Sequence, residues 1–230
     1  MRRAAALAAV LALGLAASAC QPAPAGETPP PAPRAAAADA RRAAAPRIVC
    51  LGDSLTAGLG VAPAEAYPAR LQARLRAAGY PYEVVNAGVS GDTSAGGLRR
   101  LEWSLDDEVR VLVVALGGND ALRGLPVAAL RENLAAIIET ARSQDVAVLL
   151  AGMEAPPNFG PAYTREFREA YVDLAQSYRV AFVPFLLEGV AGVRGLNQAD
   201  GIHPTPRGQQ AIADLLFPEL ERLLRTLETG

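Results

Sequence analysis

The chain has 230 residues, with 22 arginines, no lysine, 24 acidic residues and a formal net charge of −2 at pH 7. The arginines are scattered, which argues against a nucleic-acid partner because nucleic acids are bound by clustered basic surfaces. His203 is the only histidine, and no cysteine stands near it in the sequence. Since a zinc site needs several such ligands, we expect no metal and no other cofactor.

Residues 1–19 have the pattern of a secretory signal peptide. Two arginines precede an apolar stretch, and the sequence Ala-Ser-Ala at residues 17–19 offers a small-residue cleavage site. The stretch is shorter than the roughly 20 residues that a membrane-spanning helix needs. Cys20 follows directly, so lipid anchoring at this cysteine and plain secretion both fit the sequence. Either route predicts an exported protein, periplasmic or extracellular, and the first adds a membrane tether.

Residues 20–46 are predicted to be a linker, and residues 47–230 a single domain. The linker is rich in proline and alanine and nearly free of large apolar residues, so it cannot bury a core. The domain is long enough to do so, and it holds 17 of the arginines and 22 of the acidic residues. Its one cysteine, Cys50, lies in an apolar run and is expected to be a small core residue.

The domain alternates strand-like apolar runs with helix-like segments. The predicted strands are residues 47–51, 82–86, 109–116, 146–151 and 180–184. The predicted helices are residues 68–78, 94–105, a segment that begins at Pro126, 163–178 and 206–224, with a kink or break at Pro218. Alternation of this kind predicts a parallel sheet with helices on both faces.

Candidate functional residues follow four of the five predicted strands. They are Ser54 after the first strand, Gly88 after the second, Asn119 after the third, and Asp200 with His203 after the fifth. In parallel α/β sheets, ligands bind beyond the carboxyl ends of the strands. The sequence therefore predicts one functional site at this edge of the sheet.

Ser54, His203 and Asp200 are the residue types that acyl transfer requires. A serine hydroxyl becomes an effective nucleophile when a neighbouring imidazole removes its proton. Asp200 precedes His203 by three residues, so its carboxylate can fold back onto one ring nitrogen and leave the other for the serine. Taken alone, Ser54 could also be a helix cap, and Asp200 a turn residue. Ser90 is a rival nucleophile, and neither serine has the G-x-S-x-G pattern.

Gly88 and Asn119 are candidates for an oxyanion hole. The backbone N–H of Gly88 and the side-chain amide of Asn119 could donate to the oxyanion that forms when a carbonyl is attacked. Both could also be ordinary turn residues. Asp53 and Asp120 flank the candidates, and we expect their carboxylates to brace the loops by hydrogen bonds rather than to react.

Four short motifs resemble the blocks of the SGNH (GDSL) hydrolase superfamily. In chain order they are Gly52-Asp53-Ser54-Leu55, Gly88, Gly118-Asn119-Asp120 and Asp200-Gly201-Ile202-His203-Pro204. Two further stretches, residues 86–93 and 156–160, resemble the bacterial branch that includes acyl-CoA thioesterase I, lysophospholipase L1 and arylesterase. The resemblance extends from residue 47 to the last helix.

The resemblance implies a three-layer α/β/α sandwich with a five-stranded parallel sheet in the order 2-1-3-4-5. It implies Ser54 as the nucleophile, His203 as the base and Asp200 as its partner. The oxyanion would meet the N–H groups of Ser54 and Gly88 and the side chain of Asn119. The implied substrate is a small-molecule ester, thioester or lysolipid, cleaved without a metal.

Residues 153–161 are predicted to form a wall of the acyl pocket. This stretch contains three prolines and follows the fourth strand onto the same edge of the sheet. We expect Pro157, Asn158 and Phe159 to bind substrate.

Two other functions remain open from the sequence. An acyltransferase could use the same three residues to pass the acyl group to a sugar or lipid instead of water. A non-enzymatic module could hold a small ligand at the same edge of the sheet, and such a module would form no covalent intermediate on Ser54.

Overall fold

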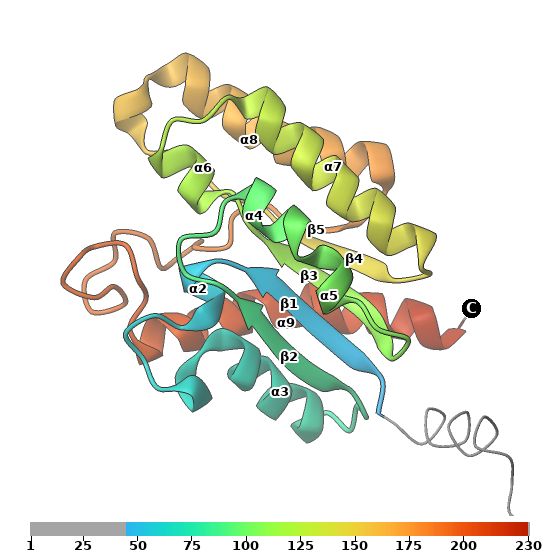
Figure 1. Ribbon diagram of the computed structural model, residues 1–230. Helices are drawn as coiled ribbons and strands as arrows, with labels where there is room; N and C mark the ends of the chain where they lie inside the picture. The colour runs from blue at the N-terminus through green and yellow to red at the C-terminus, as the bar shows by residue number, and fades with distance from the viewer. Residues whose placement is uncertain (1–44, 230) are drawn as a thin grey trace, which may run out of the picture. The chain divides into compact units, whose positions relative to one another are not determined.

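The computed structural model describes residues 45–229 as an α/β domain (Figure 1). The predicted signal peptide at residues 1–19, Cys20 and most of the predicted linker at residues 20–46 lie outside the described residues. Five strands form one sheet: β1 (Arg47–Gly52), β2 (Glu83–Gly88), β3 (Val109–Ala115), β4 (Ala147–Ala151) and β5 (Ala181–Val183). All neighbouring strands are parallel, and their order is β2-β1-β3-β4-β5, as predicted.

Helices cover both faces of the sheet and complete a three-layer α/β/α sandwich. The longer helices are α3 (Tyr67–Ala77), α7 (Val127–Ser143), α8 (Pro161–Tyr178) and α9 (Pro206–Thr229). Figure 1 shows α3 and α9 together on one face, and α7 and α8 on the other. Within residues 45–229, none of the helices combines the length and the apolar composition that crossing a membrane requires.

The core is built from the central strands and one face of each long helix. β3 is buried along almost its whole length, which explains why its sequence is a nearly continuous apolar run. In α9, buried Ile212, Leu216, Leu220 and Leu224 recur at every fourth position and form one stripe against the sheet. Cys50 is fully buried in β1, as predicted.

Three features of the helices differ from the sequence prediction. The helix predicted over residues 94–105 is two short helices, α4 (Ser94–Arg99) and α5 (Leu101–Ser104), with Arg100 between them. The last helix continues through Pro218 to Thr229, because its buried leucine stripe runs on past the proline. Several one-turn helices were not predicted, since such short elements show no periodicity: α2 (Ser54–Ala57), α6 (Gly118–Leu122), η1 (Pro63–Glu65) and η2 (Pro157–Phe159).

The register of the strands aligns three chain segments at the carboxyl edge of the sheet. Gly52, the last residue of β1, pairs with Gly88 of β2 and with Ala115 of β3. The strand order reverses between β1 and β3, and ligands of doubly wound sheets bind at this point. Segments that leave β1, β2 and β3 are therefore brought to one place, where the chemistry can occur.

Candidate active site

Ser54 lies at the start of α2, directly beyond the end of β1. The Oδ1 atom of Asp53 accepts a hydrogen bond from Leu55 N at 3.0 Å and caps the short helix. Gly52 permits the sharp turn, because a Cβ atom there would lie only 1.9 Å from Thr56 Oγ1. The turn places the partly buried Ser54 side chain at the edge of the sheet.

His203 reaches Ser54 from a long loop that follows β5. An isolated antiparallel bridge between Asn197 and Pro204 closes this loop at its base. Gln198 then holds it in place: its backbone N–H donates to His203 O at 2.7 Å, and its Nε2 donates to Leu59 O at 2.7 Å. Since Leu59 lies just beyond α2, the loop is attached to the end of the short helix whose first residue is Ser54.

The structure brings Ser54, His203 and Asp200 into one chain of contacts. His203 Nε2 lies 2.9 Å from Ser54 Oγ, and His203 Nδ1 lies 2.6 Å from Asp200 Oδ2. Asp200 Oδ1 also accepts hydrogen bonds from the backbone N–H groups of His203 and Ile202. The rival nucleophile Ser90 lies in an exposed turn after β2.

The ionised Asp200 carboxylate determines which nitrogen of a neutral His203 ring carries the proton. The His203 side chain, followed by the backbone N–H groups of His203 and Ile202, lowers the pKa of the Asp200 carboxyl to about 2. An ionised carboxylate can only accept, so Nδ1 of a neutral ring must carry the proton. Nε2 then has a free lone pair directed at the Ser54 hydroxyl, as a general base requires.

Gly88 and Asn119 both lie at the same edge, but their donors already have acceptors. Gly88 ends β2, and its N–H donates to Asn86 Oδ1 at 3.0 Å. Asn119 lies in α6, and its Nδ2 donates to Asp92 O at 2.9 Å and to Asp53 Oδ2 at 3.3 Å. The contacts of Asn86 and Asp92 could not be predicted from the sequence, because nothing in the motif pattern indicates where an amide proton is directed.

Asp53 and Asp120 make the bracing contacts that were expected of them. Asp53 links the cap of α2 to the side chain of Asn119. Asp120 accepts hydrogen bonds from Ser94 N at 2.8 Å and Ser94 Oγ at 2.6 Å, which ties α6 to α4. Asp53 is 3% exposed, and this burial raises the pKa of its carboxyl to about 6, although the bond from Leu55 N acts in the opposite direction.

A largely apolar cavity of about 430 Å³ opens beside Ser54 and His203. Of the predicted substrate-binding residues, Pro157 lines it, whereas Asn158 and Phe159 are not among the lining residues. The one-turn helix η2 directs the Phe159 ring toward Tyr163 instead, with a centroid distance of 5.4 Å. The apolar lining is made by Leu55, Leu122, Met153, Ala155, Pro156, Pro157, Phe185, Leu187, Ala191 and Ile202.

Part of the cavity lining comes from a segment to which the sequence pattern assigned no role. Phe185, Leu187 and Ala191 follow β5 and line the cavity together with residues 153–157 of the predicted wall. The apolar character of this stretch, before the histidine motif, was the available signal. It could not be used without knowing that the segment folds back over the edge of the sheet.

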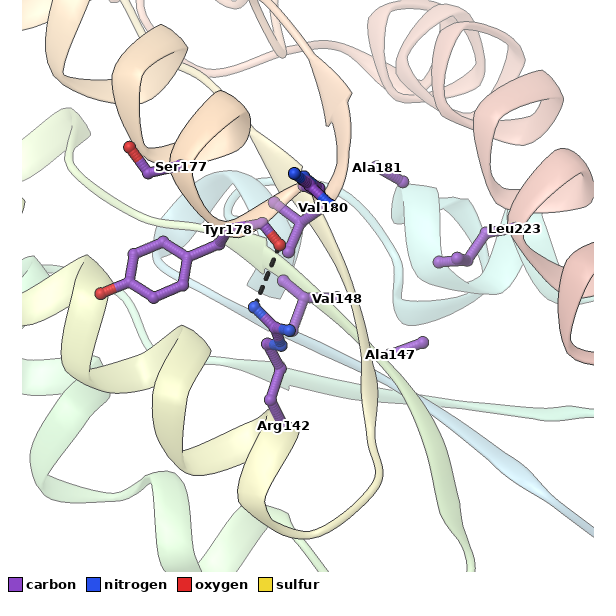
Figure 2. Close-up of a pocket in the computed structure, with 9 residues that line it drawn as sticks. Arg142, Ala147, Val148, Ser177, Tyr178, Val180, Ala181 and Leu223 are labelled. Carbon is purple, nitrogen blue, oxygen red and sulfur yellow. Dashed lines mark hydrogen bonds between the residues drawn. The ribbon is translucent and has the colours of Figure 1, made fainter.

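A second cavity lies at the other end of the sheet and offers no comparable chemistry. It has a volume of about 390 Å³ and includes the first residues of β4 and β5, Ala147 and Ala181 (Figure 2). Arg142 spans its wall by donating to Tyr178 O at 3.0 Å. Ser177 also lines it, but the chain's single histidine is at the opposite edge of the sheet, so no base stands beside this serine.

Comparison with known proteins identifies the family. A model of the GDSL-like lipase/acylhydrolase family matches residues 50–211. The chain belongs to this family. Esterase TesA of Pseudomonas aeruginosa is 48% identical over 185 residues, which cover 80% of this chain and 92% of that protein. Thioesterase 1/protease 1/lysophospholipase L1 of Escherichia coli is 37% identical, over 80% of this chain and 88% of that protein.

Solved structures agree with this assignment. The crystal structure of TesA matches with a TM-score of 0.74 and 46% sequence identity. The matched region covers 77% of this chain and 99% of the TesA chain. The chain is thus an acylhydrolase, an enzyme that cleaves carboxylic esters or thioesters, as the sequence motifs implied.

Among residues 45–229 of this GDSL hydrolase, no group of three or more His, Cys, Asp or Glu side chains is arranged to hold a metal ion.

The buried carboxyl of Asp53 predicts a specific pH dependence of stability. Its pKa is about 6 in the folded chain and near 3.8 in the unfolded chain, so folding favours the protonated form between these values. We expect the free energy of unfolding of the wild type, relative to that of Asp53→Asn, to fall as the pH rises from about 4 to 6. The decrease should be at most about 3 kcal/mol, measured by urea unfolding at each pH.

Asp173→Asn is the matched control for this experiment. Asp173 is 54% exposed and pairs with Arg131 at the surface, so removing its carboxylate changes the charge without removing a buried carboxyl. Two results would contradict the role assigned to burial. One is that the free energy of unfolding of the wild type, relative to Asp173→Asn, falls with pH in the same way. The other is that its difference from Asp53→Asn does not change with pH.

Proposed function

We propose that this GDSL hydrolase cleaves small acyl esters and thioesters through a covalent acyl-enzyme on Ser54. The observation that carries the proposal is the continuous chain of contacts from Asp200 through His203 to Ser54, beside an apolar cavity. A nucleophile, an oriented base and a place for an acyl group are the parts that this reaction needs.

In the proposed first half-reaction, Ser54 Oγ attacks the substrate carbonyl while His203 Nε2 takes the hydroxyl proton. The imidazolium that forms is stabilised by the ionised Asp200 carboxylate at Nδ1. His203 then returns the proton to the leaving oxygen or sulfur atom as the tetrahedral intermediate collapses. In the second half-reaction, water attacks the acyl-enzyme with His203 again as the base, and the free acid leaves.

The oxyanion of each tetrahedral intermediate is proposed to accept from the N–H groups of Ser54 and Gly88 and from Nδ2 of Asn119. The N–H of Ser54 is available because the first N–H groups of a helix have no partner within that helix. At Gly88, the charged oxyanion would replace Asn86 Oδ1, a neutral acceptor, as the partner of the backbone N–H. At Asn119, it would compete with the 3.3 Å contact to Asp53, which is the longer of the two amide contacts.

The lining of the cavity favours an acyl chain over a charged or sugar-like group inside it. Its lining is mostly apolar. Glu154, the charged residue among the lining residues 153–157, forms an ion pair with Arg168 at 2.9 Å. Leu122 and Ile202 line the cavity and remain about half exposed, so they offer apolar contact at its mouth. We therefore propose that short alkyl and aryl esters, acyl thioesters and lysolipids are its substrates.

Replacing the nucleophile or the base tests the proposed mechanism. Ser54→Ala and His203→Ala should each lower kcat for a short p-nitrophenyl ester by up to about 10⁶-fold, because each removes a group required in both half-reactions. Ser90→Ala, which removes the rival serine, should retain the wild-type rate. Near wild-type turnover by His203→Ala, or loss of turnover in Ser90→Ala, would contradict the mechanism.

We further propose that the protein is exported and that its hydrolase domain is carried on the linker of residues 20–46. The support is the signal-peptide pattern of residues 1–19, followed by Cys20 and a segment rich in proline and alanine. Of the two processing routes, lipid attachment at Cys20 would tether the domain to a membrane and plain secretion would release it.

Mass spectrometry of the mature N-terminus, after expression of the full chain, tests this proposal. Export predicts a chain that begins at or near Cys20, and the mass of that first residue reports whether it carries acyl chains. Cys20→Ala should abolish any acylation and leave the enzymatic activity of the domain unchanged. A mature chain that still begins at Met1 would contradict export.

A further inference from the structure

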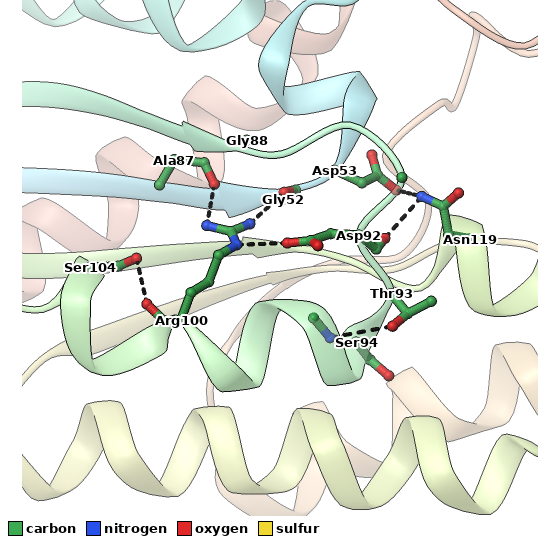
Figure 3. A network of polar contacts seen from close by, with 12 residues as sticks. Gly52, Asp53, Ala87, Gly88, Asp92, Thr93, Ser94, Arg100, Ser104 and Asn119 are labelled. Carbon is green, nitrogen blue, oxygen red and sulfur yellow. Dashed lines mark hydrogen bonds and ion pairs between the residues drawn. The ribbon is translucent and has the colours of Figure 1, made fainter.

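We infer that Arg100 is a positioning residue for the oxyanion hole, acting through three hydrogen bonds behind the site. This inference rests on the proposed function, since it concerns the donors that stabilise the oxyanion. Arg100 is not among the residues that line the active-site cavity, so it acts only through the groups that it holds. Figure 3 shows its guanidinium directed at the ends of two strands and at the loop that follows β2.

The guanidinium of Arg100 donates to three separate segments of the chain. Nη1 donates to Ala87 O at 2.7 Å, and Nη2 donates to Gly52 O at 2.8 Å. Nε donates to Asp92 Oδ2 at 2.6 Å, which makes a charge-assisted pair. The Arg100 and Asp92 side chains are only 23% and 18% exposed, so water competes weakly for these bonds.

Each of the three acceptors belongs to a residue that lies close in sequence to, or contacts, one proposed oxyanion donor. The carbonyl of Ala87 and the N–H of Gly88 belong to the same peptide group, so a bond to the carbonyl orients that N–H and polarises it. Gly52 is two residues before Ser54 and ends the strand that presents it. Asp92 offers its backbone carbonyl to Nδ2 of Asn119 at 2.9 Å.

The local structure is arranged so that Arg100 can make these contacts. Arg100 separates α4 from α5, with φ −107° and ψ 7°, where a single continuous helix was predicted. Gly96 leaves space for the carboxylate of Asp92, because a Cβ atom there would lie 2.5 Å from its Oδ1. A lysine could not replace the arginine, since one ammonium group cannot present a planar fork to three acceptors at once.

This geometry predicts a defect confined to the transition state. Donors aimed at the oxyanion act when charge develops on the carbonyl oxygen, and they add little to binding of the neutral ester. Losing Arg100 should therefore lower kcat and leave KM nearly unchanged. A residue that only stabilised the fold would instead change the melting temperature and the fraction of active enzyme.

The test compares Arg100→Gln and Arg100→Lys with Arg131→Gln, which breaks the surface pair of Arg131 with Asp173. Kinetics with a short p-nitrophenyl ester give kcat and KM, thermal unfolding shows that each variant is folded, and active-site titration corrects for inactive enzyme. Two inhibitors are added: an alkyl trifluoromethyl ketone, which forms an oxyanion adduct with a serine, and the matching secondary alcohol, which cannot.

For Arg100→Gln we expect kcat to fall by about 10- to 100-fold, with KM within a factor of three. Affinity for the trifluoromethyl ketone should fall by the same factor as kcat, whereas affinity for the alcohol should stay constant. Arg100→Lys should lie between Arg100→Gln and the wild type, and Arg131→Gln should match the wild type. If Arg100→Gln does not fold, Asp92→Asn weakens the same network and should show the same pattern to a smaller degree.

The inference is overturned if the folded variants retain wild-type kcat and wild-type affinity for the trifluoromethyl ketone. It is also overturned if ketone and alcohol lose affinity equally, since that would indicate a binding defect. Failure of the proposed function is a separate result: it would be seen as full activity of Ser54→Ala, whatever the behaviour of the arginine variants.

Discussion

The hydrogen bond between Ser54 Oγ and His203 Nε2 joins residues 149 positions apart in the chain, and the proposed chemistry depends on it. Neither residue can act alone, because a serine hydroxyl is a weak nucleophile without a base. The fold brings the two together by turning sharply at the end of β1 and by returning a long loop from β5 to the same edge of the sheet. Gln198 then fastens that loop to the turn beyond α2.

A polar layer supports this contact from behind. Asp53, Asp92 and Asp120 hold neighbouring loops through hydrogen bonds, and Asp53 does so although burial disfavours its charged form. Further back, Gln209 is fully buried, accepts from Tyr67 N at 2.8 Å and donates to Leu55 O at 3.1 Å. Satisfied polar groups of this kind fix a unique geometry, which is what preorganised catalysis requires.

Much of this arrangement could be predicted from the sequence, for identifiable physical reasons. Four of the five strands are mainly apolar runs, and β3 is apolar except at Arg110 because both of its faces are covered. The strand order and the meeting of Ser54 with His203 could be anticipated from motifs that occur in a fixed order. The contact between Asp200 and His203 could be expected because a spacing of three residues, with a glycine between them, lets the carboxylate fold back onto the ring.

The remaining features depend on tertiary contacts that no local pattern encodes. At the break between α4 and α5, the Arg100 side chain binds the ends of β1 and β2, which are distant in sequence. Asn86 and Asp92 matter through the direction of single hydrogen bonds. The lining by Phe185, Leu187 and Ala191 appears only when the loop after β5 folds over the sheet edge.

Covalent labelling with a fluorophosphonate, followed by peptide mapping, tests the central contact most directly. Phosphonylation needs a serine that a neighbouring base has activated. The account predicts one adduct per chain, located on Ser54, and a much slower reaction in His203→Ala with the site unchanged. An adduct on Ser90 or another serine, or equal labelling rates with and without the imidazole, would contradict it.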